Sequence, residues 1–147
     1  MKKLLSILML SWAFVCGQAQ QSVDMDWWRE GRFGMFIHWG LYSIPACGEW
    51  MMSQKEMTIE EYSKYFDQFD PVDYDPKKWV CLAKKAGMKY VVLTAKHHDG
   101  FCLFDSKLTD YKSTNTKTGR DLVREFVDAC REEGLKVGLY FSIIDWH

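Results

Sequence analysis

The sequence has 147 residues, of which 48% are hydrophobic and 16% aromatic, a composition typical of a folded domain with a buried core. Its 19 basic and 20 acidic residues leave a formal net charge of −1. Nucleic acids and anionic membranes are bound through an excess of Lys and Arg, so this balance argues against both partners. A neutral substrate fits the charge balance better.

The first residues have the pattern of a targeting segment. Two lysines follow Met1, an apolar run extends from Leu4 to Val15, and small residues surround Ala19. This pattern predicts a secretory signal peptide over residues 1–19, with cleavage after Ala19. The apolar run is shorter than the roughly 20 residues that span a bilayer. We therefore expect an exported protein, periplasmic or extracellular, whose mature chain is 20–147.

The five cysteines do not define a site. A lipid anchor at Cys16 is less favoured than simple export, because Val15 is larger than the small residue that such anchors prefer. The other cysteines show neither a CxxC pair nor the spacing of a zinc site. We expect them to be mostly packing residues and propose no disulfide connectivity: Cys47, Cys81, Cys102 and Cys130.

The first predicted strand is the apolar and aromatic run Phe33–Trp39. A long excursion follows, Leu41–Tyr74, and loops of this length usually serve a function. Inside it, Thr58 and Glu61 have the spacing of a capping box and predict a helix. The apolar positions that we expect this helix to bury are Ile59, Tyr62, Phe66 and Phe69.

Two further helices alternate with two further strands. Asp75 and Pro76 predict the start of a helix that ends at Gly87, and the β-branched run Val91–Leu93 predicts the second strand. The expected buried positions of that helix are Trp79, Leu82, Ala83 and Ala86. Thr118 and Asp121 are predicted as the capping box of the next helix, which stops at Gly134 and buries Leu122, Val123, Phe126, Val127 and Cys130. Val137–Phe141 predicts the third strand.

The element order β-α-β-α-β predicts an α/β fold with a parallel sheet. A (β/α)₈ TIM barrel is the leading interpretation. An open doubly wound sheet gives the same local pattern, but no glycine-rich phosphate loop follows the first strand. A complete barrel takes about 250 residues. Residues 20–147 are therefore interpreted as the N-terminal portion of a barrel domain, with about the first three β/α units of a truncated chain. Phe36, Val92 and Leu139 are expected to face the interior of that barrel.

Polar residues follow the end of each predicted strand. His38 follows the first strand, His97 and His98 follow the second, and Tyr140 and the stretch Asp145–His147 accompany the third. The carboxyl ends of parallel barrel strands share one face, where barrel enzymes build their sites. We therefore expect the three histidines to converge in one pocket. Structural roles for individual histidines remain the alternative.

A metal at the adjacent histidines is disfavoured, and no cofactor is expected. Neighbouring residues on an extended strand point to opposite sides, so His97 and His98 should not chelate one ion. Neutral imidazoles suit sugar hydroxyls better, Glu49 offers an acceptor, and Trp39 and Trp50 offer flat apolar surfaces for a pyranose. No GxSxG motif supports acyl transfer. Glycoside hydrolysis requires two carboxylates, which composition alone does not identify.

The motifs taken together resemble the retaining α-L-fucosidase family, with the family's order and similar spacing. The segments that carry the resemblance are Trp27–Gly40, Gly48–Trp50, Lys96–Phe101 and Gly138–Tyr140. The resemblance implies a (β/α)₈ barrel followed by a β-sandwich, and hydrolysis of terminal α-L-fucose from glycans or glycoconjugates with retention and without a metal. Carried over by motif, the implied fucose-binding residues are His38, Glu49, Trp50, His97, His98 and Tyr140.

The resemblance also implies that the catalytic residues are absent from this stretch. The family's nucleophile and acid/base lie at later strands, beyond His147, and Asp99, Asp105 and Asp145 occupy other places in the family's motifs. We therefore expect the 147-residue chain to be inactive alone. The alternatives are a non-catalytic carbohydrate-binding module and an open-sheet enzyme of another class.

Overall fold

The computed structural model describes residues 25–147. The predicted signal peptide therefore lies outside the described residues. A short helix, α2 (Asp26–Glu30), falls in a different compact unit from Gly31–His147, which contains every other element described below. No helix within 25–147 is long and apolar enough to cross a membrane.

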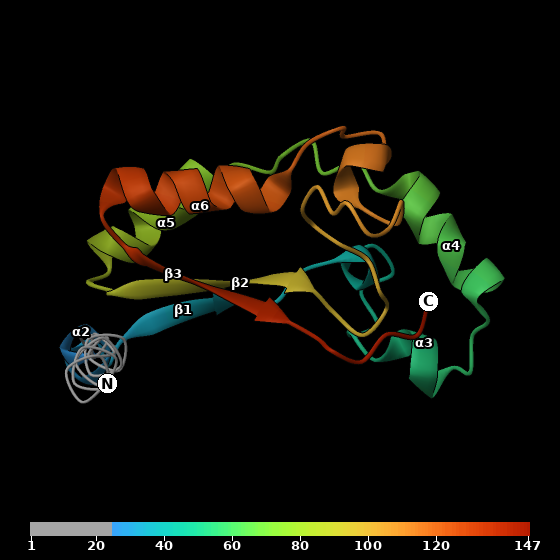
Figure 1. The fold of residues 1–147 in the computed structure, drawn as a ribbon, viewed down its shortest axis with the longest axis horizontal. Coiled ribbons are helices and arrows are strands. Elements are labelled where there is room, and N and C mark those ends of the chain that lie inside the picture. Colours follow the sequence, from blue (N-terminus) through green and yellow to red (C-terminus); the bar gives the residue numbers. More distant parts are fainter. Residues whose placement is uncertain (1–24) are drawn as a thin grey trace, which may run out of the picture. The chain divides into compact units, whose positions relative to one another are not determined.

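The centre of the unit is a three-stranded parallel sheet in the order β1-β2-β3 (Figure 1). The strands are β1 (Gly34–Ile37), β2 (Tyr90–Lys96) and β3 (Lys136–Phe141). The predicted parallel β-α-β-α-β order is confirmed. Strand β2 is longer than its apolar core suggested and β1 is shorter, because hydrogen-bonded pairing decides the ends of a strand.

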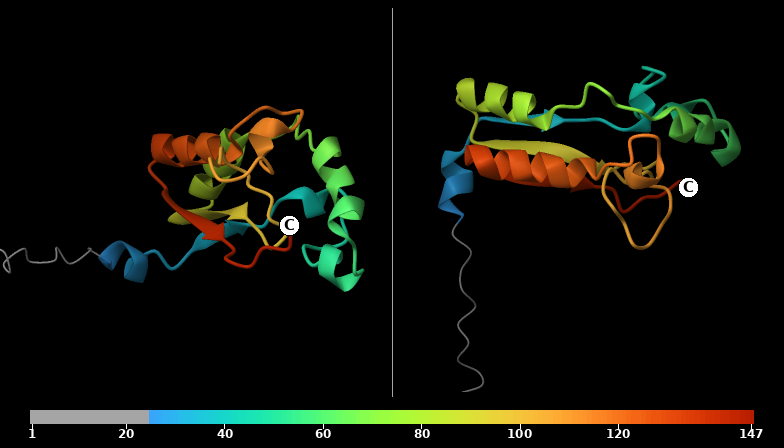
Figure 2. Two further views of the ribbon diagram at one scale, coloured as in Figure 1. Left: turned by 45° about the vertical axis from the view of Figure 1, so that its right-hand side comes forward. Right: turned by 90° about the horizontal axis from the view of Figure 1, so that it is seen from above.

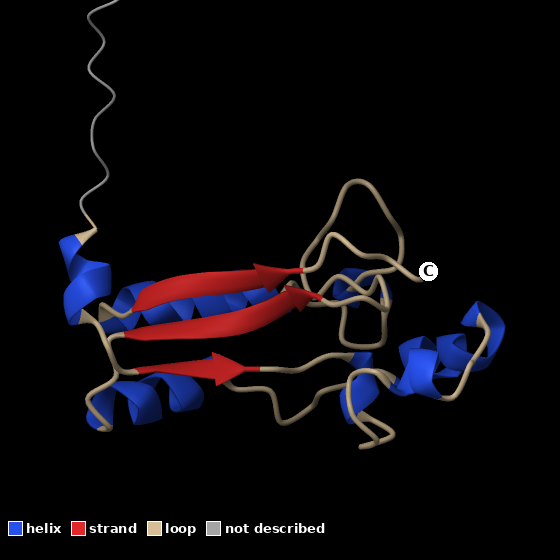
Figure 3. Cartoon of the chain, turned by 90° about the horizontal axis from the view of Figure 1, so that it is seen from below, coloured by secondary structure: helices blue, strands red, loops and turns tan. Residues whose placement is uncertain are grey.

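Two helices cover one face of the sheet and leave the other bare (Figure 3). They are α5 (Pro76–Lys85) and α6 (Leu122–Glu133). The Asp75 carboxylate accepts a hydrogen bond from the Lys78 amide at 3.1 Å and caps α5, as the sequence predicted. Gly134 ends α6 in the left-handed region, with φ of 71°.

The predicted cap of α6 is wrong in part. Asp121 itself is the N-cap residue, and its carboxylate accepts from the Arg124 amide at 2.8 Å. Thr118 lies three residues before it in a turn and forms no part of the cap. The Asp121 carboxylate satisfies the Arg124 amide, and the Leu103 carbonyl accepts from the Val123 amide, so the first turn is capped without Thr118.

The main core lies between the helices and the covered face of the sheet. Val91, Leu93 and Ala95 of β2 point into it and are at most 3% exposed. The helical residues buried against them are Val80, Ala83, Leu122, Phe126, Ala129 and Cys130. This arrangement follows from the period of two along a strand and 3.6 along a helix.

Three predicted core positions are wrong. Leu82 is 67% exposed and Ala86 is exposed, because α5 turns Val80 and Ala83 towards the sheet and these two positions away from it. Ile59 is 46% exposed, since it lies in the first turn of its helix beside an open pocket that Trp146 also lines.

The excursion between β1 and α5 adds the elements η1 (Leu41–Ser43), α3 (Met51–Gln54) and α4 (Ile59–Gln68). The predicted capping box of α4 is present, with Thr58 and Glu61 as its members. Tyr62 and Phe69 are buried at 2% and 3% exposure. The loop between β2 and α6 contains η2 (Ser113–Asn115). All these segments lie near the carboxyl ends of the strands (Figure 1, Figure 2).

The bare face of the sheet carries Phe36, Val92 and Gly138, which are partners in the strand register. Phe36 is 51% exposed and Val92 is only partly buried. Leu139 was expected to face the barrel interior with them, and this expectation is wrong. Leu139 lies on the opposite face of the sheet, because it is in register with Leu93. Parallel barrels fill such an inner face with side chains from other strands.

All four described cysteines are free thiols. Cys102 and Cys130 are buried packing residues, as predicted, and Cys81 is partly buried. Cys47 is exposed in the excursion after β1, so it is not a packing residue.

Candidate functional site

The predicted histidines meet at the carboxyl ends of the strands. His38 follows β1, and His97 and His98 follow β2 directly. The ring centroids of His38 and His97 are 4.9 Å apart, and those of His97 and His98 are 4.2 Å apart. Tyr140 of β3 stacks against His97 at 5.8 Å. Four of the predicted site residues therefore form one aromatic cluster.

His38 forms the solvent-exposed side of the cluster. Its Nδ1 lies 2.9 Å from the Tyr42 hydroxyl, and its ring meets the edge of Phe36 at 5.8 Å. Tyr42 is 5% exposed, and burial raises the pKa of its hydroxyl above the usual range. The phenol therefore remains protonated, and its hydrogen bond with Nδ1 fixes the orientation of the His38 ring.

His97 is the buried centre of the cluster, at 4% exposure. Burial lowers the pKa of His97 to about 4, and the neighbouring His98 and His38 rings add to the effect. The ring is therefore neutral at physiological pH. Its Nδ1 has no hydrogen-bond partner among the described residues. Buried polar atoms normally have one, so this nitrogen is suited to a ligand.

His98 is 8% exposed and is held from the protein side. Its Nδ1 lies 2.5 Å from the Ser142 hydroxyl oxygen. Trp50 approaches the ring edge at 4.9 Å and Trp146 lies 5.1 Å away, with the two indoles 5.4 Å apart. Trp50 is 44% exposed and offers an apolar surface beside the histidines.

Glu49 completes the set of predicted site residues. Its side chain is partly buried next to Trp50 in the sequence. Burial dominates the lowered pKa of His97, and the Glu49 carboxylate opposes the shift by electrostatic attraction. Its charge also acts on Tyr42. The carboxylate therefore belongs to the same end of the sheet as the histidine cluster.

Trp39 packs mainly against other aromatic side chains, and it lines an open cavity of about 460 Å³ together with His38. Its ring stacks on Tyr74 at 5.1 Å with an interplanar angle of 9°, and it also contacts Phe69 and Trp79. Trp39 follows His38 directly, and successive side chains of an extended segment point to opposite sides. Its neighbour faces the site, so Trp39 packs on the helix side.

The same alternation fails for His97 and His98, whose rings lie side by side. Strand β2 ends at Lys96, so both residues occupy the turn that follows, where the period of two no longer applies. Within residues 25–147, no group of three or more His, Cys, Asp or Glu side chains is arranged to hold a metal ion.

The residues that support the cluster were not among the predicted site residues. Lys96 is buried, and its ammonium donates to the carbonyl oxygens of Ser142 at 3.2 Å and Ile144 at 3.5 Å. It also forms an ion pair with Asp145 at 2.9 Å. Lys96 precedes the two histidines directly, and that position was the feature of the sequence that could have identified Lys96 as a supporting residue. The serine and isoleucine belong to no motif.

Asp99 and Asp105 are engaged by other protein groups. Asp99 is 2% exposed and accepts hydrogen bonds from the Tyr62 hydroxyl at 3.0 Å and the Phe101 amide at 3.2 Å. Burial raises the pKa of Asp99 to about 6. Asp105 pairs with Lys112 at 2.9 Å. These carboxylates have structural partners, as Asp145 does, so none of the three is assigned a catalytic role.

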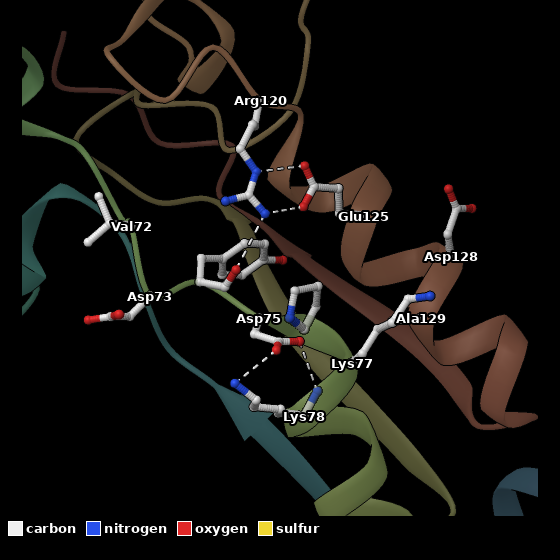
Figure 4. Close-up of a pocket in the computed structure, with 11 residues that line it drawn as sticks. Val72, Asp73, Asp75, Lys77, Lys78, Arg120, Glu125, Asp128 and Ala129 are labelled. Carbon is white, nitrogen blue, oxygen red and sulfur yellow. Dashed lines mark hydrogen bonds and ion pairs between the residues drawn. The ribbon is translucent and has the colours of Figure 1, made fainter.

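A separate cavity of about 630 Å³ lies by the N-terminal ends of α5 and α6 (Figure 4). Two ion pairs join polar groups that line it. Arg120 donates to both carboxylate oxygens of Glu125, and Lys78 pairs with Asp75. None of the predicted site residues lines this cavity, so volume alone does not locate the site.

The fold and site define a class: parallel strands that present imidazole, aromatic and carboxylate groups at their carboxyl ends, as in β/α enzymes. The comparisons with known proteins agree. The family model "Alpha-L-fucosidase" matches residues 16–147. The chain belongs to the α-L-fucosidase family.

Solved structures of this family share the fold. α-L-Fucosidase isoenzyme 1 from Paenibacillus thiaminolyticus has 67% sequence identity and a TM-score of 0.82, over 84% of this chain and 29% of that one. An α-L-fucosidase from Bacteroides thetaiotaomicron has 43% identity and a TM-score of 0.81, over 86% and 31%. Tissue α-L-fucosidase of Rattus norvegicus is 36% identical over 82% of this chain. The chain spans about 30% of the length of that relative.

Proposed function

We propose that the complete protein is an exo-acting α-L-fucosidase that hydrolyses terminal α-L-fucose from glycans or glycoconjugates with retention. In this proposal the described chain contributes the fucose-binding part of a (β/α)₈ catalytic barrel. The observation that carries it is the convergence of His38, His97 and His98 with Tyr140 at the carboxyl ends of the sheet, in a chain that belongs to this family.

The chemistry of the cluster suits a neutral sugar. His97 is uncharged at neutral pH, because burial lowers its pKa to about 4, and its unpartnered Nδ1 suits a hydroxyl group. The exposed indole of Trp50 offers an apolar surface for the C–H face or methyl group of fucose. Glu49 supplies an acceptor that suits hydroxyl donors.

The proposed mechanism is a double displacement. Retaining glycosidases use two carboxyl groups about 5–5.5 Å apart, one as nucleophile and one as acid/base. A solved structure of the Bacteroides thetaiotaomicron enzyme is a trapped covalent intermediate with 2-fluoro-fucosyl fluoride, which supports the same course here. The family resemblance implies that both catalytic carboxylates lie beyond His147, and the structural partners of Asp99, Asp105 and Asp145 agree with that placement. The 147-residue chain alone should then be inactive.

The test is steady-state hydrolysis of an aryl α-L-fucoside by the complete protein. We expect His38→Ala and His97→Ala each to lower kcat/KM roughly 5- to 150-fold, since a lost buried hydrogen bond costs about 1–3 kcal/mol. Ser63→Ala is the matched control and should retain full activity, because Ser63 is a partly exposed residue of α4 whose hydroxyl donates to the Glu60 carbonyl of its own helix. Unchanged kcat/KM in both histidine variants would refute the site. Binding of L-fucose without hydrolysis would identify a carbohydrate-binding module instead.

We further propose that the protein is exported with residues 1–19 removed. The support is the lysine-led apolar run that ends at Val15 and the small residues around Ala19. N-terminal sequencing of the protein from its native host should begin at Gln20. A mature N-terminus at Met1 would contradict the proposal, and a lipid-modified Cys16 would establish the anchored form.

A further inference from the structure

We infer that Ser142 is a positioning residue that fixes the tautomer of His98, so that His98 accepts a hydrogen bond from a hydroxyl of the bound sugar. The inference rests on the proposed function for the identity of the ligand. The tautomer itself depends only on contacts within the protein, so the two claims can be tested separately.

The Ser142 hydroxyl has two neighbours and only one hydrogen to donate. Its oxygen lies 2.5 Å from Nδ1 of His98 and 2.8 Å from the carbonyl oxygen of Ile144. A carbonyl oxygen can only accept, so the hydroxyl hydrogen must point towards Ile144. The hydroxyl then presents a lone pair to His98, and a hydrogen bond forms only if Nδ1 carries the proton.

Burial makes this arrangement selective. Ser142 is 4% exposed and His98 is 8% exposed, so water has little access to replace either partner. In the opposite tautomer the hydroxyl could bond Nδ1 only by turning its hydrogen away from Ile144, which would leave two acceptor oxygens facing each other at 2.8 Å. A neutral imidazole protonated on Nδ1 keeps an unprotonated Nε2. His98 is therefore an acceptor at Nε2, and a hydroxyl of the sugar is the donor that matches it.

The segment that carries Ser142 is anchored to the end of β2 on both sides of the serine. The Ser142 amide donates to the Lys96 carbonyl at 3.0 Å, and the Trp146 amide donates to the His98 carbonyl at 2.7 Å. The Lys96 ammonium holds the carbonyls of Ser142 and Ile144. The Ile144 carbonyl, which orients the Ser142 hydroxyl, is therefore itself held by the buried Lys96 ammonium.

The direct test is the protonation pattern of the His98 ring in the complete protein labelled with ¹⁵N-histidine. His98→Gln assigns the His98 resonances. We expect a protonated, pyrrole-type Nδ1 and an unprotonated Nε2 in the wild type near pH 7. Ser142→Ala should move His98 towards the Nε2-protonated form, while Ser142→Thr, which keeps the hydroxyl, should retain the wild-type pattern. Ser63→Ala is the control and should change nothing.

A wild-type His98 protonated on Nε2 would overturn the inference, even if Ser142→Ala fails to fold. An unchanged tautomer in a folded Ser142→Ala protein would overturn it as well. In an L-fucose titration, Ser142→Ala should bind about 2- to 10-fold more weakly, the range expected for one net hydrogen bond, with recovery in Ser142→Thr. Equal affinity would refute the positioning role. A wild-type protein that does not bind L-fucose but carries the proton on Nδ1 of His98 would refute the proposed function alone.

Discussion

The two faces of the sheet are built on different principles. On the covered face, Val91 and Leu93 are completely buried beneath α5 and α6, all within one stretch of chain. On the bare face, Phe36 is 51% exposed, and the histidine cluster lies at the end of that face. The comparison teaches that local β/α units complete the first face by themselves. In the barrel that we propose for the complete protein, side chains from other strands cover the second face, which carries the proposed chemistry.

The largest expected effect concerns the piece Gln20–His147 produced alone. Its bare face and the outer edges of β1 and β3 would meet solvent or other chains, because open edges recruit further strands. Burying each large apolar side chain contributes about 1.5–3 kcal/mol, so several exposed ones outweigh a stability of roughly 5–15 kcal/mol. We expect association and non-cooperative unfolding in analytical ultracentrifugation and urea titration. A monomer with a sharp transition would break the comparison.

The covered face should show the next largest effect in the complete protein. Leu93→Ala removes a side chain that is 0% exposed, and the cavity should cost about 2–5 kcal/mol in the free energy of unfolding. Val72→Ala, at a position 78% exposed, is the control and should stay within about 0.5 kcal/mol. Urea denaturation measures both. Similar losses in the two variants would show that the covered face is not the main core.

The site end should differ from the covered face in its response to pH. Burial raises the pKa of Asp99 from 3.8 to about 6, so folding favours its protonated form. Its contribution to stability is complete below pH 3.8 and declines as the pH rises to about 6. Asp99→Asn should therefore gain about 2 kcal/mol relative to wild type between pH 4 and 7. A constant difference across this range would contradict the shift.

His97 produces the opposite slope. Its pKa of about 4 lies below the ordinary 6.5, so the unfolded chain binds a proton first as the pH falls. Stability from this group is present above pH 6.5 and is lost towards pH 4. In Asp99→Asn the opposing contribution of Asp99 is absent. The free energy of unfolding should therefore fall more steeply between pH 6.5 and pH 4. In the double variant that also carries His97→Gln, the free energy of unfolding should again depend little on pH in this range.

The smallest expected effect tests close packing on the bare face. A Cβ atom added at Gly34 would lie 2.4 Å from the Tyr90 ring, far inside contact distance. Gly34→Ala should therefore cost about 1–3 kcal/mol through overpacking. Tyr90→Ala combined with Gly34→Ala should cost less than the sum of the two single changes, because the clash is gone. Additive costs in urea titrations would show that the ring moves freely aside.

Much of the fold was predictable because it rests on local rules. The Asp75 cap, the Gly134 stop and the Thr58 capping box each involve neighbours within four residues, and all three are confirmed. Leu82 was misassigned because helical spacing gives relative positions around an axis but not the direction of the core. Leu139 was misassigned because the facing direction depends on register with Leu93.

The site was predictable only where motifs lie at strand ends. His38, His97 and Tyr140 converge as expected, because the carboxyl ends of parallel strands meet at one edge. Ser142 was not predictable, since its role depends on a contact 44 residues away in the sequence. Trp39 shows the reverse: its position next to His38 was a local signal that the two side chains point to opposite sides.

The most direct measurement is a crystal structure of the complete protein with L-fucose bound. The account predicts the sugar at the carboxyl ends of the strands, within hydrogen-bond distance of His97 and His98, and with a hydroxyl directed at Nε2 of His98. Trp50 should contact its apolar face. Fucose bound instead in the cavity lined by Arg120, or on the helix-covered side of the sheet, would contradict the central claim.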